Sequence, residues 1–227
     1  MIVLLAGGAK LRAQGEAELK PGRDMELWLS AAVETRPFSD KSRVAQTAFM
    51  KHFRTALELG YRSNENLGNG KNTYATLGIR YKVNDHLRFG VDNRYNIRDR
   101  NSSNSYRIDF GPTFSAKAGR FDLGYRATFQ HEFIPVYRVR DYLRNRVSVG
   151  YRIKGFRVDP YVSVESFTAF HYKGSYYAGI RYDIGGHVNL KGDHALDIAL
   201  RHDREIGVTE PLYRTIIVVA YEFEWQR

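Results

Sequence analysis

The chain has 227 residues, enough for one domain with a sizeable interior, and 26% of them are charged. Its formal net charge is +10, but no basic block is long enough to mark a nucleic-acid-binding tail, so we expect no nucleic-acid partner. There is no cysteine, which excludes disulfides, thiolate metal sites and cysteine nucleophiles, and there is no run of 18 apolar residues, which excludes a transmembrane helix.

Residues 1–15 look like the end of a secretory signal peptide. Residues 2–9 form a short apolar core, and Ala13-Gln14-Gly15 places small residues where a signal peptidase would cut. Because the basic n-region is missing, we expect a truncated signal peptide over 1–15, followed by a single barrel domain over 16–227. The alternative for this segment is an ordinary buried strand or helix.

From Asp24 onward apolar and polar residues alternate with period two, which predicts strands with two chemically different faces. Eleven segments show the pattern: 25–33, 53–61, 75–83, 87–97, 106–116, 121–133, 147–153, 158–164, 176–184, 196–200 and 217–225. The pattern is clearest around Lys154-Gly155, where a glycine turn separates two alternating arms and predicts a β-hairpin.

An up-and-down meander of this length leaves exposed edges unless it closes on itself. Segments of roughly ten to thirteen residues match tilted membrane-spanning strands better than soluble strands. The sequence therefore predicts an all-β fold, a closed antiparallel up-and-down transmembrane β-barrel in the bacterial outer membrane. Because bacterial single-chain barrels have even strand numbers, we expect twelve strands, the twelfth hidden between Pro37 and Met50, or else ten. Pro160, which cannot donate to a strand ladder, predicts a local bulge.

The two faces of the segments predict where each residue type lies. Aromatic residues near segment ends are expected at the membrane interfaces: Trp28, Tyr61, Tyr106, Tyr142, Tyr177 and Trp225. Charged residues on the opposite face are expected to form a lumen network: Arg54, Glu58, Arg88, Asp92, Arg94, Arg107, Asp109, Arg126, Arg144, Arg146, Arg152, Glu165, Arg181, Asp183, Arg201 and Glu222. A soluble periplasmic ligand-binding barrel has the same periodicity with its faces exchanged, and it remains an alternative.

Five stretches, in this order, resemble the family called domain of unknown function 2490 (DUF2490): ELWLSAAVETR, RTALELGYR, YLRNRVSVGYRI, VDPYVSVESF and VVAYEFEW. The marks of the resemblance are Trp28, the Arg144-x-Arg146 pair and Glu165-x-Phe167, and it covers the chain from Glu26 to Trp225. The resemblance implies an outer-membrane β-barrel of a Gram-negative bacterium and brings no established activity. The ending Gln226-Arg227 departs from the terminal aromatic residue usual in such barrels.

No motif for catalysis or metal binding stands out. His131-Glu132 lacks the second histidine of a zincin helix, and the adjacent His202 and Asp203 must point to opposite faces of a strand. We therefore expect no catalytic residue, no metal and no cofactor. A lipid-modifying hydrolase or acyltransferase remains an alternative, although no G-x-S-x-G elbow is present.

The charged face supports a non-enzymatic, porin-like role: structural, binding, or passage of small anionic solutes. Small barrels are often filled by their side chains, so a lumen filled by arginine–carboxylate pairs is favoured over an open pore. The expected partners are outer-membrane lipid, including lipopolysaccharide, and the barrel-assembly machinery during biogenesis. The sequence names no other protein partner.

Overall fold

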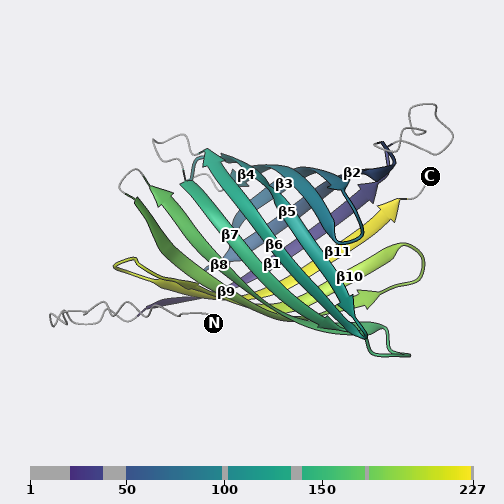
Figure 1. The fold of residues 1–227 in the computed structure, drawn as a ribbon. Helices are drawn as coiled ribbons and strands as arrows, with labels where there is room; N and C mark the ends of the chain where they lie inside the picture. The colour runs from purple at the N-terminus through teal and green to yellow at the C-terminus, as the bar shows by residue number, and fades with distance from the viewer. Residues whose placement is uncertain (1–20, 38–49, 99–101, 134–139, 172–173, 226–227) are drawn as a thin grey trace, which may run out of the picture.

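A computed structural model describes residues 21–37, 50–98, 102–133, 140–171 and 174–225. These residues form one closed barrel of eleven tilted strands (Figure 1). The strands are β1 Gly22–Thr35, β2 Phe53–Asn64, β3 Asn69–Lys82, β4 Leu87–Arg98, β5 Ser105–Ala118, β6 Phe121–Phe133, β7 Arg140–Tyr151, β8 Val158–His171, β9 Gly174–Asn189, β10 His194–Glu205 and β11 Leu212–Trp225. A 3-10 turn, η1 Met50–His52, precedes β2. Among the described residues no helix is long and apolar enough to cross a membrane.

The closed β-barrel expected from the sequence is confirmed, but its closure differs from the expectation. β1 pairs antiparallel with β2 over Trp28–Thr35 and parallel with β11 over Gly22–Thr35. The arrowheads of β1 and β11 accordingly point to the same end of the barrel (Figure 1). A meander with an odd number of strands can close if one neighbouring pair is parallel, because a parallel ladder also satisfies both strand edges. The described residues therefore close the barrel with eleven strands, and the expected twelve, or ten, are not found.

Two expectations from the sequence fall on residues that the structure does not describe. The signal peptide predicted at 1–15 lies outside the described residues, as does nearly all of the stretch from Pro37 to Met50 in which a hidden strand was expected. β1 and β2 are direct neighbours in the closed sheet, so no further strand lies between these two.

The odd strand number places the two ends of the barrel wall at opposite rims. We call the rim where β1 begins the N rim and the rim where β11 ends the C rim. At the C rim the connection from β3 to β4 is an Asx turn, in which the Asn84 side-chain oxygen accepts the N–H groups of His86 and Leu87 at 2.8 Å each. In the same turn Lys82 donates to Asp85 at 2.6 Å and holds the pKa of that exposed carboxyl below its usual range.

The hairpin around Lys154-Gly155 forms as predicted, because Gly155 adopts the left-handed conformation, with φ at +80°, between β7 and β8. The bulge expected at Pro160 is not found, because Pro160 lies opposite Gly186 of β9 in continuous register. On its other side β8 pairs with β7 only from Tyr161 onward, so Pro160 has no partner residue in β7. The missing N–H of Pro160 therefore costs no bond to β7. The register shift occurs instead between Phe167 and Thr168.

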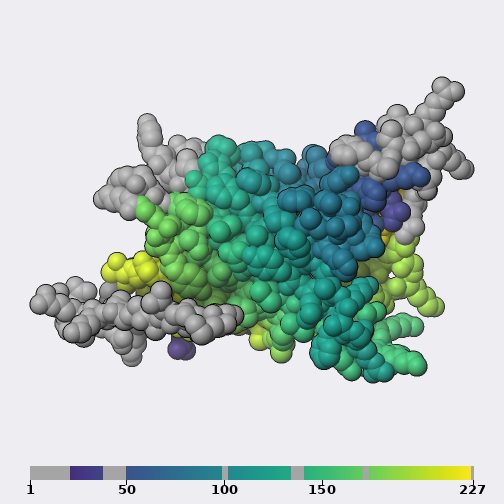
Figure 2. All heavy atoms as spheres, viewed as in Figure 1, coloured from purple at the N-terminus to yellow at the C-terminus, as the bar shows by residue number. Residues whose placement is uncertain are grey.

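The barrel is apolar outside and polar inside. Among the described residues the buried apolar side chains are few: Tyr74, Ala169, Ala199 and Ile216. The buried polar and charged side chains are three times as many: Glu26, Ser63, Thr76, Arg94, Asn96, Ser105, Asp109, Gln130, Ser163, Glu165, Asp183 and Asp203. Each strand in turn exposes large apolar side chains, among them Leu29, Leu57, Leu77, Val91, Phe110, Leu123, Val147, Val162, Ile184, Ile198 and Tyr221. The wall of the middle strands, seen from outside in teal, is covered continuously by side chains (Figure 2).

Candidate functional site

The lumen holds a cavity of about 710 Å³ to which every strand contributes residues. Its positive charges are all arginines among the described residues: Arg62, Arg80, Arg88, Arg94, Arg107, Arg126, Arg144, Arg146, Arg181, Arg201 and Arg214. Eight carboxylates face them: Glu58, Asp92, Asp109, Glu132, Glu165, Asp203, Glu205 and Glu222. Two further buried carboxylates, Glu26 and Asp183, pair with arginines of this lining. Arginine exceeds carboxylate even when these two are included.

Glu165 lies at the centre of the largest ion-pair cluster, with 2% of its side chain exposed. The Nε and Nη2 of Arg144 donate to its Oε1 at 3.1 and 2.9 Å, and the Nη1 of Arg181 donates to its Oε2 at 3.2 Å. The Nη2 of Arg126 is 3.8 Å from Oε1. The register creates this cluster, because Glu165 of β8 lies directly opposite Arg146 of β7 and Arg181 of β9.

Asp183 of β9 holds a second cluster. Arg201 grips its carboxylate with two parallel hydrogen bonds, Nε to Oδ1 at 2.7 Å and Nη2 to Oδ2 at 3.1 Å. Arg146 Nη2 lies 3.2 Å from Oδ2, and the Ser163 hydroxyl donates to the same oxygen at 3.1 Å. Such forked pairs are stronger and more directional than single-point contacts, so this wall of the lumen is held in one arrangement.

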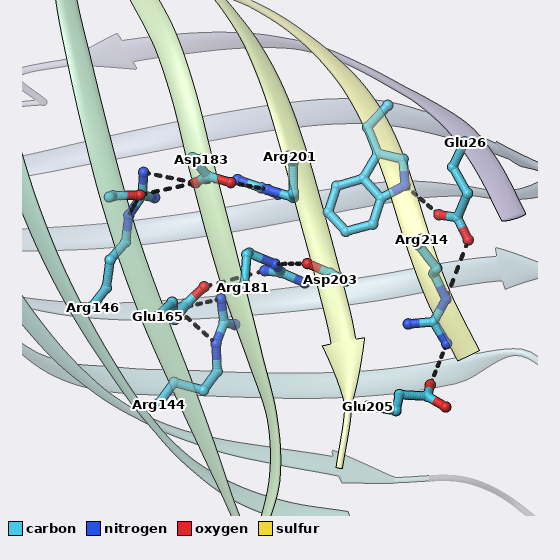
Figure 3. Close-up of polar contacts among 12 residues, drawn as sticks. Glu26, Arg144, Arg146, Glu165, Arg181, Asp183, Arg201, Asp203, Glu205 and Arg214 are labelled. Atoms are coloured by element: carbon cyan, nitrogen blue, oxygen red, sulfur yellow. Dashed lines mark hydrogen bonds and ion pairs between the residues drawn. The ribbon is translucent and has the colours of Figure 1, made fainter. Parts of the chain in front are cut away.

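Arg181 joins the neighbouring strands into a row. Its Nε and Nη2 donate to the two carboxylate oxygens of Asp203 at 2.6 and 2.8 Å, while its Nη1 reaches Glu165. The result is two rows of alternating charge that cross β7 to β10 (Figure 3): Arg146–Asp183–Arg201 and Arg144–Glu165–Arg181–Asp203. Burying so many charges is tolerated because each carboxylate of the two rows pairs with at least one arginine.

A third group connects β1 with β11. Glu26, with 0% of its side chain exposed, accepts a hydrogen bond from the Trp28 indole at 2.6 Å and another from Lys71 Nζ at 2.6 Å. Arg214 of β11 lies 3.6 Å from the same carboxylate and also pairs with Glu205 (Figure 3). These contacts tie together the parallel seam of the barrel.

Aromatic rings lie between the arginines of the lumen. The guanidinium carbon of Arg62 is 3.9 Å from the ring centroid of Trp28, and those of Arg201 and Arg181 are 5.1 and 5.4 Å from it. Phe167 lies under Arg181 at 4.9 Å in the same way. Such stacking contributes roughly 0.5–1 kcal/mol per contact and helps to fill the lumen around Trp28.

Tyr74 enters the lumen because its cross-strand neighbour is a glycine. A Cβ on Gly60 would lie 2.2 Å from the Tyr74 ring, so no larger residue leaves room for that ring in its present position. The Tyr74 hydroxyl donates to Glu58 at 2.7 Å, and Arg94 stacks on the ring at 3.9 Å.

The structure places most of the charged residues named from the sequence at this cavity. They are Glu58, Arg88, Asp92, Arg94, Arg107, Asp109, Arg126, Arg144, Arg146, Glu165, Arg181, Arg201 and Glu222. Asp183 does not line the cavity itself, but it is buried beside it and pairs with the lining residues Arg146 and Arg201. Two others form separate pairs near the C rim: Arg54 binds Glu34 and Glu224 at 2.7 and 2.9 Å, and Arg152 binds Asp122 at 3.0 Å.

Several lumen residues were not named from the sequence. They are Arg62, Asp203, Arg214 and Glu26. Asp203 and Glu26 lie one alternation step from Arg201 and Trp28, whereas Arg62 and Arg214 lie four and eight residues from Glu58 and Glu222 on the same strands. The period-two signal that identifies Arg201 therefore extends to Asp203, two residues further along β10.

Two of the six aromatics expected at the membrane interfaces are inside the barrel, which corrects that assignment. Trp28 and Tyr142 line the cavity, because each is an even number of residues from charged lumen residues on its own strand. Tyr61, Tyr106, Tyr177 and Trp225 are exposed outside, the first three near the N rim and Trp225 near the C rim.

Comparison with known proteins agrees with this architecture. A solved structure described as a bacterial polysaccharide outer membrane secretin has a similar fold, with a TM-score of 0.52 and 9% sequence identity over 73% of this chain. The match spans 62% of that protein, less than two thirds of its length, and at this identity the likeness concerns the fold alone. No curated protein matches the chain. A family model described as "Protein of unknown function (DUF2490)" matches residues 25–206, which confirms the resemblance read from the sequence. The chain therefore belongs to the DUF2490 family.

Proposed function

We propose that this protein is a non-enzymatic outer-membrane β-barrel of a Gram-negative bacterium, and that its lumen binds small anionic solutes and lets them pass. The first support is the outer surface. All eleven strands contribute exposed apolar side chains to a band around the barrel, and apolar patches of this extent mark membrane or protein contacts. The strands have 12 to 16 residues, and roughly 9–11 suffice for a tilted strand to cross a bilayer.

Polar side chains on the outer face form hydrogen bonds with one another, as an apolar surrounding requires. The Asn93 side-chain oxygen accepts the Tyr106 hydroxyl at 2.6 Å, and the Asn145 oxygen accepts the Tyr125 hydroxyl at 2.8 Å. In lipid, a polar group without such a partner would cost several kcal/mol. A soluble ligand-binding barrel needs its apolar face inside, and here that face is outside. Lipid, including lipopolysaccharide, is the partner that this surface suits.

The observation that carries the lumen proposal is the excess of arginine around the cavity. Eleven arginines line the lumen there against ten carboxylates, Glu26 and Asp183 included, and rings of arginine favour anions in pores. The ordered charge rows and the aromatic rings occupy much of the lumen, so we expect selective binding and slow passage and not a wide, unselective channel. The absence of enzymatic activity stays a prediction.

The two tryptophans of the chain offer a test of the membrane placement. Brominated lipid quenches the fluorescence of tryptophans that contact it. In vesicles made from such lipid, the variant Trp28→Phe should lose most of its fluorescence, because its remaining tryptophan, Trp225, faces outward. The variant Trp225→Phe, which keeps Trp28, should be quenched little, since that indole lies in the lumen. Equal quenching of the two variants would contradict either the lumen position of Trp28 or the lipid contact of the outer face.

Ion selectivity in planar bilayers tests passage. With a tenfold KCl gradient across the membrane, the reversal potential should have the sign that reports preference for Cl⁻ over K⁺, because arginine dominates the lumen. Raising the salt concentration should reduce this preference, since it screens the exposed part of the lining. A preference for K⁺, or the absence of any conductance, would contradict anion passage.

A further inference from the structure

Three arginines lie close together on one wall of the lumen, and two of them stack on the same ring. Arg62 of β2 and Arg94 of β4 both stack on Tyr74 of β3, with guanidinium carbons 5.1 and 3.9 Å from the ring centroid. Arg107 of β5 lies directly opposite Arg94 in the register of the sheet. We call Arg62, Arg94 and Arg107 the arginine triad.

The triad lacks matching negative charge. Arg107 pairs with Asp109 at 2.7 Å, but Arg94 reaches Glu58 only at 3.5 Å, and that carboxylate already accepts the Tyr74 hydroxyl. No carboxylate of the described residues lies within 4.0 Å of the Arg62 guanidinium, which instead lies over the rings of Trp28 and Tyr74.

Unused hydrogen-bond donors point to the same conclusion. The Nε atoms of Arg62 and Arg107 are buried and have no hydrogen-bond partner among the described residues. Both arginines line the cavity. A buried N–H of a charged group that is left unpaired is costly, so a bound acceptor would stabilise this wall.

The opposite wall shows what a balanced arrangement looks like in the same lumen. There Glu165, Asp183 and Asp203 each bind one or more arginines through short contacts. Arg94 and Arg107 are direct cross-strand neighbours on the triad wall, and like charges in that position repel each other. Arg126 and Arg146 are opposed in the same way, but Arg126 lies 3.8 Å from the buried Glu165 and Arg146 lies 3.2 Å from the buried Asp183. The difference between the walls is therefore Arg62, which has no carboxylate within 4.0 Å among the described residues, together with the weak 3.5 Å contact of Arg94.

We propose that the arginine triad binds a doubly charged oxyanion of the phosphate type, either inorganic phosphate or the phosphate group of a phosphomonoester. This inference rests on the proposed function and names the solute class of the same lumen. A tetrahedral dianion offers several oxygens to the forked donors of guanidinium groups and neutralises more than one of them. Chloride cannot accept a forked pair, and a monocarboxylate carries half the charge.

The test is a binding measurement on the full-length barrel folded in detergent micelles. Inorganic phosphate is titrated calorimetrically at constant ionic strength, and acetate and chloride serve as comparison anions. Phosphate should bind more tightly than either, and Arg62→Gln should weaken phosphate binding by about tenfold or more, the effect of losing one charge-assisted contact. A parallel titration with glycerol 3-phosphate distinguishes a free phosphate site from one that accepts phosphomonoesters.

A matched control is Arg152→Gln, which removes a lumen-side arginine that pairs with Asp122 near the C rim, away from the triad. Its phosphate affinity should equal that of the unchanged barrel. Arg62→Lys keeps the charge without the forked pair of donors, so it should bind phosphate with intermediate affinity. A folded barrel migrates differently on an SDS gel before and after boiling, and Arg62→Lys replaces Arg62→Gln if the latter does not show this shift.

Two results would overturn the inference. One is phosphate binding no tighter than acetate binding, and the other is tight phosphate binding that Arg62→Gln and Arg62→Lys leave unchanged. Either could occur while the bilayers still show anion preference, in which case the proposed function stands without this site. Loss of anion preference in the bilayers would instead reject the proposed function itself.

Discussion

Replacing Glu165 with glutamine should destabilise the barrel by about 3–5 kcal/mol, the usual cost of removing one partner from a buried ion-pair cluster. The carboxylate binds Arg144 and Arg181 by hydrogen bonds and lies 3.8 Å from Arg126. Glutamine has nearly the same shape, so the change removes the negative charge with little loss of packing. Three guanidinium groups would then face one another across a site that is 2% exposed.

The measurement is the urea midpoint of unfolding of the barrel in lipid vesicles, followed by tryptophan fluorescence and by the shift of the gel band. Asp122→Asn is the matched control, because its carboxylate also binds an arginine of the barrel but is 40% exposed. Exposed pairs contribute little, so this variant should lose less than about 1 kcal/mol. Equal losses in the two variants would show that the Glu165 cluster has no special weight in the stability of the barrel.

The alternation of residue types predicted the fold because it is a local property. Each strand shows its two faces within about ten residues, so the barrel and the charge of its lumen follow from segments considered one at a time. Even Trp28 and Tyr142 could have been placed by this rule. Trp28 is two residues from Glu26, and Tyr142 is two residues from Arg144, so both share the charged face. They were assigned outside because aromatic residues near strand ends are common at membrane interfaces.

The pairing of charges could not be predicted, because it depends on register between strands. Glu165 meets Arg181 only because β8 and β9 align at that row, and a shift of one residue would turn either strand inside out. The same applies to the like-charged neighbours Arg94 and Arg107. Nothing in either segment alone shows that two arginines will lie side by side while Arg62 lacks a carboxylate.

The strand count was predicted wrongly for a different reason. An even number follows from requiring the first and last strands to be antiparallel, and the sequence of β1 contains no signal for a parallel neighbour. The alternation had shown eleven segments, and the added twelfth came from the general rule. The parallel seam with β11 has 14 residue pairs, from Gly22↔Leu212 to Thr35↔Trp225, so it is as extensive as an ordinary ladder of this barrel.

Replacing Trp28 with alanine should raise the single-channel conductance of the barrel, because the indole lies among arginines from different parts of the wall. The guanidinium carbon of Arg62 in β2 is 3.9 Å from the centroid of the indole ring, and those of Arg201 in β10 and Arg181 in β9 are 5.1 and 5.4 Å from it. Removing the ring opens volume between these guanidinium groups and exposes their charge to passing ions, so anion preference should be retained or increase. The loss of three cation–π contacts of roughly 0.5–1 kcal/mol each should lower the stability by about 1.5–3 kcal/mol.

Single-channel recordings under symmetrical KCl measure the effect directly, and the second tryptophan supplies the control. Trp225→Ala removes an indole from the outer face, 47% exposed, and should leave the conductance unchanged. Trp28→Phe keeps an aromatic face for the arginines but loses the hydrogen bond to Glu26, so it should resemble the unchanged barrel in conductance more than Trp28→Ala does. If Trp28→Ala conducted no better than the unchanged barrel, the ring would not obstruct the ion path, and the constriction would have to be sought in the charge rows of β7 to β10.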